Sequence, residues 1–282
     1  MSNVIALIFD FDETLMPDST SAFLEEYSID TEKFWNEEVK SLVNKGFEPT
    51  HAFLSNFLKH TDKGGKLQGI SDDDMLKFGE KISNKFYKGF PEILQNLQNR
   101  IAQYPDLTLE FYIISGGLQK IIEGTSASKF FKAIYACELS FESGKQGYIK
   151  RVVTFTEKTR YIFEINKGIL PKDTIKRPYY VNEFKAPEKR RVPLNNMIYV
   201  GDSRTDIPCF SLITSNGGHA FAVFDHNNVE SAASKFKDFV AEKRSSVQKF
   251  PAVYTEDSFG ATLKLTIQQL IGKIVTSDQN IY

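Results

Sequence analysis

Residues 4–15 read VIALIFDFDETL, and this stretch constrains the fold more than any other part of the chain. A short apolar run rich in β-branched residues predicts a buried strand over residues 4–9. The run stops at Asp10 and Asp12. Because alternate residues of an extended chain point the same way, both carboxylates face one place, and burying them is costly unless they meet a cation or hydrogen-bond donors. The sequence therefore predicts a site at the carboxyl end of this strand.

Other short apolar runs also stop at polar or glycine-rich segments. The predicted strands cover residues 107–114, 197–200 and 220–224, with a hairpin over 136–155 around its SGKQG turn. Helical patterns over 91–103 and 156–168 lie between them. Short buried strands that alternate with helices predict an α/β fold, with a doubly wound, mainly parallel sheet of the Rossmann-like type.

Residues 17–88 have a different pattern, with apolar residues at helical spacing in three stretches. We predict a helical cap domain over 17–88, inserted into a core formed by residues 1–16 and 89–282. The alternative is a small subdomain that only packs on the core and has no role at the site. Because the insertion leaves the core directly after the acidic pair, its position favours a lid over the strand ends.

The composition excludes several classes of function. With 282 residues, 41% hydrophobic and 25% charged, the chain is typical of globular proteins. Its net charge of -1 gives no general attraction to nucleic acid or an anionic membrane. It has no membrane-spanning run or signal-peptide pattern, and Cys137 and Cys209 are isolated. We expect a reduced, cytoplasmic protein without nucleic-acid or membrane partners.

The groups at strand ends and helix starts together predict phosphoryl transfer. Asp10 and Asp202 offer hard oxygen ligands suited to Mg²⁺, and Lys158 adds positive charge beside the transferring group. Asp10 would be the nucleophile that forms an aspartyl-phosphate, and Asp12 the acid and base that exchanges protons with the leaving group and water. Donors for the phosphate oxygens come from a segment predicted to open a helix, namely Ser115, Gly116 and Gly117.

These motifs, in this order, resemble those of the haloacid dehalogenase-like hydrolase superfamily. DFDET is similar to its first motif, Ser115 to the second, Lys158 to the third and GDSRTD (201–206) to the fourth. The inserted helices resemble the cap between its first and second motifs. Three segments are similar to the phosphoserine phosphatase-like branch: FYKGFPEIL, CELSFESGKQG and MIYVGDSRTDIPCF.

The resemblance implies a Mg²⁺-dependent phosphoric monoester hydrolase that acts on a small phosphorylated metabolite. The implied metal ligands are Asp10, Asp12 (through its carbonyl), Asp202 and Asp206. The phosphate-binding group comprises Thr14, which would help to order the first loop, with Ser115, Gly116 and Gly117. Lys158 lies 44 residues before Asp202, farther than is usual in this branch, because residues 169–195 form an insertion; Lys167 is the alternative lysine.

Two departures from the branch argue against phosphoserine as the substrate. Its phosphoserine enzymes carry an acidic residue about seven positions after the second aspartate, where this chain has Ser19, and an arginine in the cap. Here no arginine precedes Arg100, and an arginine fork is the natural partner of a substrate carboxylate.

Two other activities and one non-catalytic role are alternatives to a phosphatase. A dehalogenase would not need an acid at Asp12. A phosphotransferase or phosphomutase would use the same residues, and a non-catalytic phosphate-binding protein would keep the fold.

The insertion 169–195 is basic, which predicts a solvated loop or, alternatively, a surface that attracts a polyanionic substrate or partner. Its basic residues are Lys172, Lys176, Arg177, Lys185, Lys189, Arg190 and Arg191.

Overall fold

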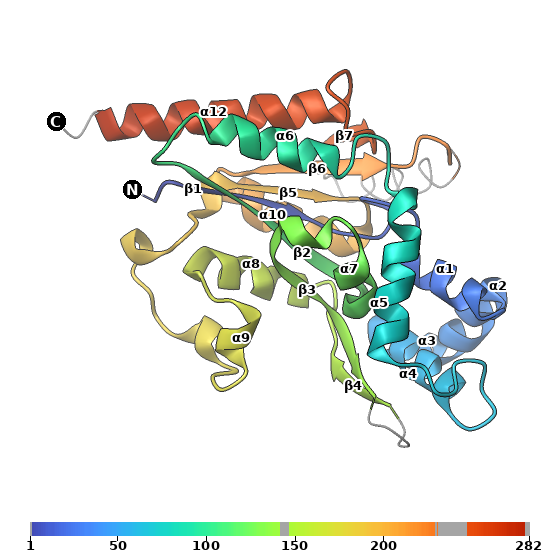
Figure 1. The fold of residues 1–282 in the computed structure, drawn as a ribbon. Coiled ribbons are helices and arrows are strands. Elements are labelled where there is room, and N and C mark those ends of the chain that lie inside the picture. Colours follow the sequence, from blue (N-terminus) through green and yellow to red (C-terminus); the bar gives the residue numbers. More distant parts are fainter. Residues whose placement is uncertain (1, 142–146, 229, 231–246, 280–282) are drawn as a thin grey trace.

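The structure is a computed structural model that describes residues 2–141, 147–228, 230 and 247–279. Within these residues, seven strands form one sheet in the order β4-β3-β2-β1-β5-β6-β7 (Figure 1). The strands are β1 (Val4–Phe9), β2 (Thr108–Leu118), β3 (Phe131–Ser140), β4 (Tyr148–Arg151), β5 (Met197–Gly201), β6 (His219–Phe224) and β7 (Gln248–Pro251). All neighbours pair in parallel except β3 and β4. The predicted α/β fold with a mainly parallel sheet is confirmed.

The strand order places β1 at the centre of the sheet. The chain builds β2 and β3 on one side of β1 and then crosses over to build β5, β6 and β7 on the other. Residues 5–9 of β1 are completely buried. The strand has a neighbour on each edge, since Leu7 pairs in register with Phe111 of β2 and with Ile198 of β5. Ligands of open α/β sheets bind outside the carboxyl ends of the strands where the order reverses. That point lies beyond Phe9.

Helices cover both faces of the sheet (Figure 1). On one face lie α6 (Glu92–Ile101) and α12 (Phe259–Gln279), and on the other lie α8 (Glu157–Lys167) and α10 (Ile207–Ser215); α7 (Gln119–Gly124) follows β2 and packs against β3. Helices α6 and α8 match predicted helices, whereas α12 and β7 carry no prediction from the sequence. None of the helices in the described part of the chain is both long and apolar enough to cross a bilayer.

A group of helices lies between β1 and β2 in the chain and to one side of the sheet, and we call them the cap helices (Figure 1). They are α1 (Ser19–Glu26), α2 (Thr31–Lys33), η1 (Phe34–Val39), α3 (Lys40–Asn44), α4 (Pro49–Thr61), α5 (Asp72–Lys81) and η2 (Ile82–Lys85). Segment η1 is a π-helix, so the helix that runs through α2, η1 and α3 is wound more loosely in its middle. Phe23, Phe57 and Phe78 form the aromatic centre that joins α1, α4 and α5.

Two glycines allow the cap helices to approach the core closely. A Cβ on Gly79 of α5 would lie 2.1 Å from the carbonyl oxygen of Ile121 in α7. A Cβ on Gly124, at the end of α7, would lie 2.0 Å from the carbonyl oxygen of Leu76 in α5. The two helices therefore cross with backbone against backbone, and only glycine fits at either position.

The structure corrects the prediction for residues 115–117. Strand β2 continues to Leu118, and α7 begins at Gln119, so Gly116 and Gly117 do not open a helix. Ile114 pairs with Tyr135 and Leu118 with Cys137, so β2 advances by four residues over a stretch in which β3 advances by two. Residues 115–117 therefore bulge out of the ladder, which is a common way to aim backbone and side chains at a site.

Two inserted features lie away from the sheet centre. Strands β3 and β4 form the predicted hairpin, but residues 143–146 of its turn lie outside the described residues. The basic insertion 169–195 contains α9 (Pro171–Thr174) and two short 3-10 turns, η4 (Tyr180–Asn182) and η5 (Pro187–Lys189). A third 3-10 turn, η6 (Leu194–Asn196), begins in the insertion and ends one residue after it. It lies on the side of the molecule opposite the cap helices (Figure 1).

Candidate active site

A cavity of about 360 Å³ lies between the carboxyl ends of the central strands and the cap helices. Its core side is lined by Asp10, Asp12, Glu13, Ser115, Gly116, Gly117, Lys158, Asp202, Ser203 and Thr205. Its other side is lined by Asp18, Thr20, Trp35, Pro49, Thr50 and Phe53. The volume is in the range of small-molecule sites. The predicted strand ends thus converge on a single hollow.

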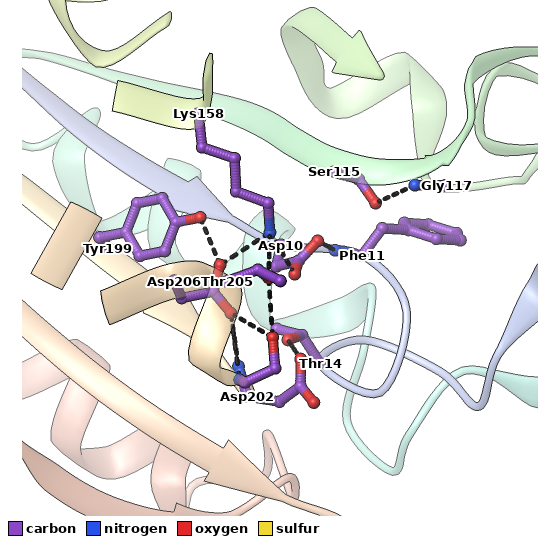
Figure 2. A network of polar contacts seen from close by, with 11 residues as sticks. Asp10, Phe11, Thr14, Ser115, Gly117, Lys158, Tyr199, Asp202, Thr205 and Asp206 are labelled. Atoms are coloured by element: carbon purple, nitrogen blue, oxygen red, sulfur yellow. Dashed lines mark hydrogen bonds and ion pairs between the residues drawn. The ribbon is translucent and has the colours of Figure 1, made fainter. Parts of the chain in front are cut away.

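Lys158 is the centre of the polar network in Figure 2. It stands in the first turn of α8, and its side chain is 2% exposed. Its ammonium group donates to Oδ2 of Asp10 at 2.6 Å and to Oδ1 of Asp206 at 2.8 Å. The other oxygen of Asp10 accepts from the amide of Phe11 at 2.7 Å. Asp10 is thereby fixed in orientation by one ammonium group and one amide.

The alternative lysine is not near this network. Lys167 stands in the last turn of the same helix, and its ammonium group donates to the carbonyl oxygens of Val181 and Glu183 in the insertion. Of the two candidates, the structure therefore brings only Lys158 to Asp10. Position in the sequence could not decide between them, because the long insertion changes the spacing to GDSRTD.

Asp206 supports the network from behind the cavity. It is completely buried and does not line the hollow. Its Oδ1 accepts from Tyr199 at 2.8 Å as well as from Lys158, and its Oδ2 accepts from the amides of Asp202 and Ser203. The side chain thus holds both the lysine and the loop that carries Asp202. Tyr199 is a site residue that sequence analysis missed, because a tyrosine inside an apolar strand gives the signal of a core residue.

We call Asp10, Asp202 and Asp206, together with Lys158, the acidic cluster. One carboxylate oxygen from each aspartate lies within 4.8 Å of the others. All three aspartates are buried, and the ammonium group of Lys158 pairs with two of them, Asp10 and Asp206. Thr14 does not line the cavity; its hydroxyl donates to Oδ1 of Asp202 at 3.3 Å.

The surroundings shift the pKa of each group in the cluster. Burial raises the pKa of Asp10 to about 6, although the charge of Lys158 opposes the shift. Burial works against the charge of Lys158, but the carboxylates of Asp10 and Asp206 outweigh it and hold the lysine pKa above its ordinary value. The lysine is therefore permanently charged, whereas Asp10 needs further positive charge to be fully ionised at neutral pH.

Asp12 occupies a different environment, at the start of the first cap helix. Its Oδ1 accepts from the amide of Ser19 at 2.8 Å. Burial and the nearby charge of Asp18 raise the pKa of Asp12 well above the usual range, against the effect of the Ser19 hydrogen bond. A carboxyl group that retains its proton beside an ionised one suits a proton carrier. The Ser19 hydroxyl is buried and has no hydrogen-bond partner among the described residues.

The bulge of β2 brings its residues against Asp12. A Cβ on Gly117 would lie 2.4 Å from Oδ2 of Asp12, so only glycine allows this approach. The amide of Gly117 donates to the Ser115 hydroxyl at 3.1 Å, and both residues line the cavity together with Gly116. The segment thus faces the aspartates, although it does so as a bulged strand and not as a helix start.

The donor set of the acidic cluster fits a hard divalent cation. Mg²⁺ prefers carboxylate, carbonyl and water oxygens, and Asp10 and Asp202 present such oxygens to the cavity. Two buried carboxylates, those of Asp10 and Asp206, share one ammonium group, which leaves an excess of negative charge that burial makes costly. A divalent cation would balance that charge.

Comparisons with known proteins identify relatives of this fold. No family model matches the chain. An uncharacterized protein of Borreliella burgdorferi is 29% identical over 242 residues, which are 76% of this chain and 79% of that protein. The structure of cytosolic 5'-nucleotidase IIIB bound to cytidine superimposes with a TM-score of 0.52 at 17% identity, over 96% of this chain and 86% of that one. A substrate-bound phosphoserine phosphatase gives a TM-score of 0.46 at 14% identity, over 86% and 99%.

The chain shares the fold of cytosolic 5'-nucleotidase IIIB. The superposition covers 96% of this chain and 86% of the nucleotidase, so the likeness extends over the whole fold rather than one motif. The sequence motifs that predicted this fold lie where the structure brings the strand ends together. The shared fold locates the site, and the chemistry has to be argued from the residues in it.

Proposed function

We propose that this protein is a Mg²⁺-dependent phosphatase that hydrolyses a small phosphomonoester through an aspartyl-phosphate on Asp10. The observation that supports this most is the acidic cluster itself. A buried carboxylate held by a lysine opens into a cavity beside a second carboxyl group, that of Asp12, whose pKa is raised by burial. A structural ion cluster would need neither the cavity nor the second acid. The fold shared with a 5'-nucleotidase is consistent with this reaction.

Asp10 and Asp202, with the main-chain carbonyl of Asp12, would hold Mg²⁺, and Asp206 would support them through the amides of Asp202 and Ser203. When bound, the ion supplies positive charge that keeps Asp10 ionised and neutralises phosphate oxygens. The rest of the chemistry belongs to the side chains described above.

Asp10 is the nucleophile. The amide of Phe11 and the ammonium group of Lys158 fix its carboxylate, so one oxygen can be presented to phosphorus while the plane of the group is held. An Asp10 oxygen forms a bond to phosphorus as the bond from phosphorus to the ester oxygen breaks. Lys158, Ser115 and the amides of the bulge offer donors to the phosphate oxygens in this step.

Asp12 carries the proton in both halves of the reaction. It first gives its proton to the departing ester oxygen, so the alcohol leaves neutral. It then takes a proton from the water that attacks the phosphorus of the aspartyl-phosphate, which releases inorganic phosphate and restores Asp10. Its raised pKa, caused by burial and Asp18, favours the protonated state that the first half needs.

Phosphoserine remains an unfavoured substrate under this proposal. Among the described residues that line the cavity, Lys158 is the single cation, and it is bound to Asp10 and Asp206. A substrate carboxylate would therefore meet no arginine fork.

The test is phosphate release from a panel of monoesters with Mg²⁺, with a chelator control and the Asp10→Asn variant. We expect activity that needs Mg²⁺ and disappears in Asp10→Asn. Acid quench during turnover should trap a phosphoryl group on the peptide that contains Asp10. Full activity in Asp10→Asn would refute the mechanism. Sugar and nucleoside acceptors added to the assay would reveal a phosphotransferase as phosphorylated acceptor in place of free phosphate.

A glycine pair provides a matched geometric test. Gly117→Ala puts a methyl group against Asp12, and we expect about 10- to 100-fold loss in kcat, because misplacing a reacting group by an ångström has such effects. Gly116→Ala should cost less, since its Cβ would meet only a carbonyl oxygen, that of Val153, at 3.8 Å. Equal losses in the two variants would argue against a role for Asp12.

A further inference from the structure

The cap side of the cavity differs in chemistry from the core side, and this difference indicates which leaving group the site accepts. We propose, on the basis of the phosphatase function above, that the preferred phosphomonoester carries a flat aromatic ring without negative charge, as a nucleoside monophosphate does, and that Trp35 is the surface on which this ring stacks.

Trp35 differs from the other aromatic residues at its end of the cap. Phe23, Phe34 and Phe57 are completely buried, and they form the interior of the cap helices. Trp35 is only partly buried and lines the cavity together with Phe53. The two rings lie 5.6 Å apart between centroids at an interplanar angle of 50°, so they contact each other directly. They form one continuous aromatic wall, against which a ligand ring can lie.

The indole of Trp35 is held by its edge. Its Nε1 donates to the Ser21 hydroxyl at 2.7 Å, and that hydroxyl donates to Asp18, which caps helix α1. The one polar atom of the ring is therefore satisfied within the protein, and the ring is fixed in orientation. Residue 35 also lies in the π-helical segment η1, a loosened helical turn of a kind often found at functional sites. A fixed aromatic face at low entropic cost is a suitable stacking surface.

Charge excludes an anionic leaving group. Away from the acidic cluster, the cavity is lined by the carboxylates of Glu13 and Asp18. Within the described lining, the single cation is Lys158, which is committed to the phosphate end. A carboxylate or a second phosphate on the leaving group would be repelled at this end of the cavity. An uncharged ring joined to hydroxyl groups meets acceptors and an apolar wall instead.

The first experiment compares substrates that share the reacting ester. Cytidine or adenosine 5'-monophosphate and ribose 5-phosphate have the same phosphorylated carbon, but ribose 5-phosphate lacks the ring. We expect kcat/KM for the nucleotides to exceed that for ribose 5-phosphate by about 10- to 100-fold, which is the effect of stacking one base. Phosphoserine should be poorer still.

Substitutions of Trp35 test whether the aromatic wall causes the preference for nucleotides over ribose 5-phosphate. Trp35→Ala should lower the nucleotide-to-ribose 5-phosphate ratio about tenfold or more, and Trp35→Phe should restore part of it. Phe47→Ala is the matched control, since Phe47 is an exposed aromatic residue of the same region that does not line the cavity, and it should leave the ratio unchanged. A ratio near one in the wild type, or a ratio insensitive to Trp35→Ala, overturns the inference.

A binding measurement separates this inference from the proposed function. Trp35 is the only tryptophan in the chain, so intrinsic tryptophan fluorescence reports on this residue alone. In the Asp10→Asn variant with Mg²⁺, nucleoside monophosphates should quench the fluorescence after correction against free tryptophan, and ribose 5-phosphate should not. Quenching without turnover in the wild type would refute the phosphatase and keep the ring site. Turnover of monoesters without selective quenching would refute the ring site and keep the phosphatase.

Discussion

Two buried ionic clusters in this protein use similar residues and have opposite electrostatic character. The first is the acidic cluster, in which three carboxylates gather and one ammonium group pairs with two of them, Asp10 and Asp206. The second, which we call the Glu110 cluster, joins one buried carboxylate in the first half of β2 to Lys132, Arg191 and the hydroxyl of Tyr112. Burial raises the pKa of Asp10 to about 6, whereas at Glu110 the hydrogen bonds from Arg191, Lys132 and Tyr112 overcome burial and lower the pKa.

The comparison shows how a candidate functional site differs from an ion cluster that only stabilises the fold. The Glu110 cluster is electrically satisfied by its own partners, so it stabilises one arrangement of β2, β3 and the end of the insertion. The acidic cluster is not satisfied by Lys158 alone, and it borders a cavity. A charge deficit that borders a cavity indicates a ligand that completes it.

The largest effect is expected from Lys158→Met. Removing the ammonium group leaves Asp10 and Asp206 buried without their cation, and breaking such a pair costs about 3–5 kcal/mol in the free energy of unfolding. We expect kcat to fall by at least about 10²–10³-fold, as when a preorganised donor to the transition state is lost. Urea unfolding and phosphate release measure the two effects. Lys167→Met, at the other end of α8, should keep kcat, and equal losses in both variants would contradict the assignment.

Removing Mg²⁺ tests the charge deficit directly. A cation that binds only the folded state at 100 times its Kd raises the free energy of unfolding by about 2.7 kcal/mol. We expect thermal unfolding to shift upward with Mg²⁺, to return with a chelator, and to lose its response in Asp202→Asn. Glu110→Gln should keep the full Mg²⁺ response. A response that survives in Asp202→Asn would move the cation site elsewhere.

The Glu110 cluster should contribute stability that depends on pH. Because the folded pKa of Glu110 is lowered, its contribution is present above the unfolded pKa of about 4.3 and is lost as the pH falls through the folded value. We expect Glu110→Gln to cost about 1–2 kcal/mol at pH 7, since Lys132 and Arg191 are partly exposed to solvent. The cost should shrink in acid, and kcat should be unaffected. A cost that stays constant from pH 7 down to pH 3 would exclude this account.

The smallest effect is expected at Tyr199, which positions Asp206 and touches no substrate. Tyr199→Phe removes one of the hydrogen bonds to Asp206 and should cost about 0.5–1.5 kcal/mol with a few-fold loss in kcat. Tyr161→Phe is its control, because the buried Tyr161 hydroxyl has no hydrogen-bond partner in the described part of the chain. If the two variants behaved alike in both measurements, Tyr199 would have no positioning role.

The sequence predicted those parts of the site that depend on local patterns. Apolar runs that stop at Asp10, Ser115 and Asp202 are visible without a structure, because strand burial and the exposure of strand ends are local properties. The bulge at Ser115–Gly117 was not predictable, since it depends on the register between β2 and β3. The choice between Lys158 and Lys167 depends on how an insertion is accommodated.

Contacts between distant segments account for the other omissions. Arg191 and Glu110 are 81 residues apart in the chain, and no pattern in either segment pairs them. Trp35 has the spacing of a core residue, and whether its ring faces the interior or a cavity is decided by the packing of α4 against η1. Strand β7 and helix α12 follow a segment that carries no clear pattern, and tertiary packing against β6 and α6 defines them.

The crossing of α5 and α7 at Gly79 and Gly124 has a consequence for the width of the cavity under the cap helices. Because nothing but hydrogen separates the two backbones, a single added methyl group must push them apart by roughly an ångström. Phe78 contacts Phe23, which contacts Phe57, so the displacement passes from α5 to α1 and α4. A single substitution at either glycine, far from the cavity, can therefore change the cavity's width, while the aspartates and Lys158 stay in place on the core side.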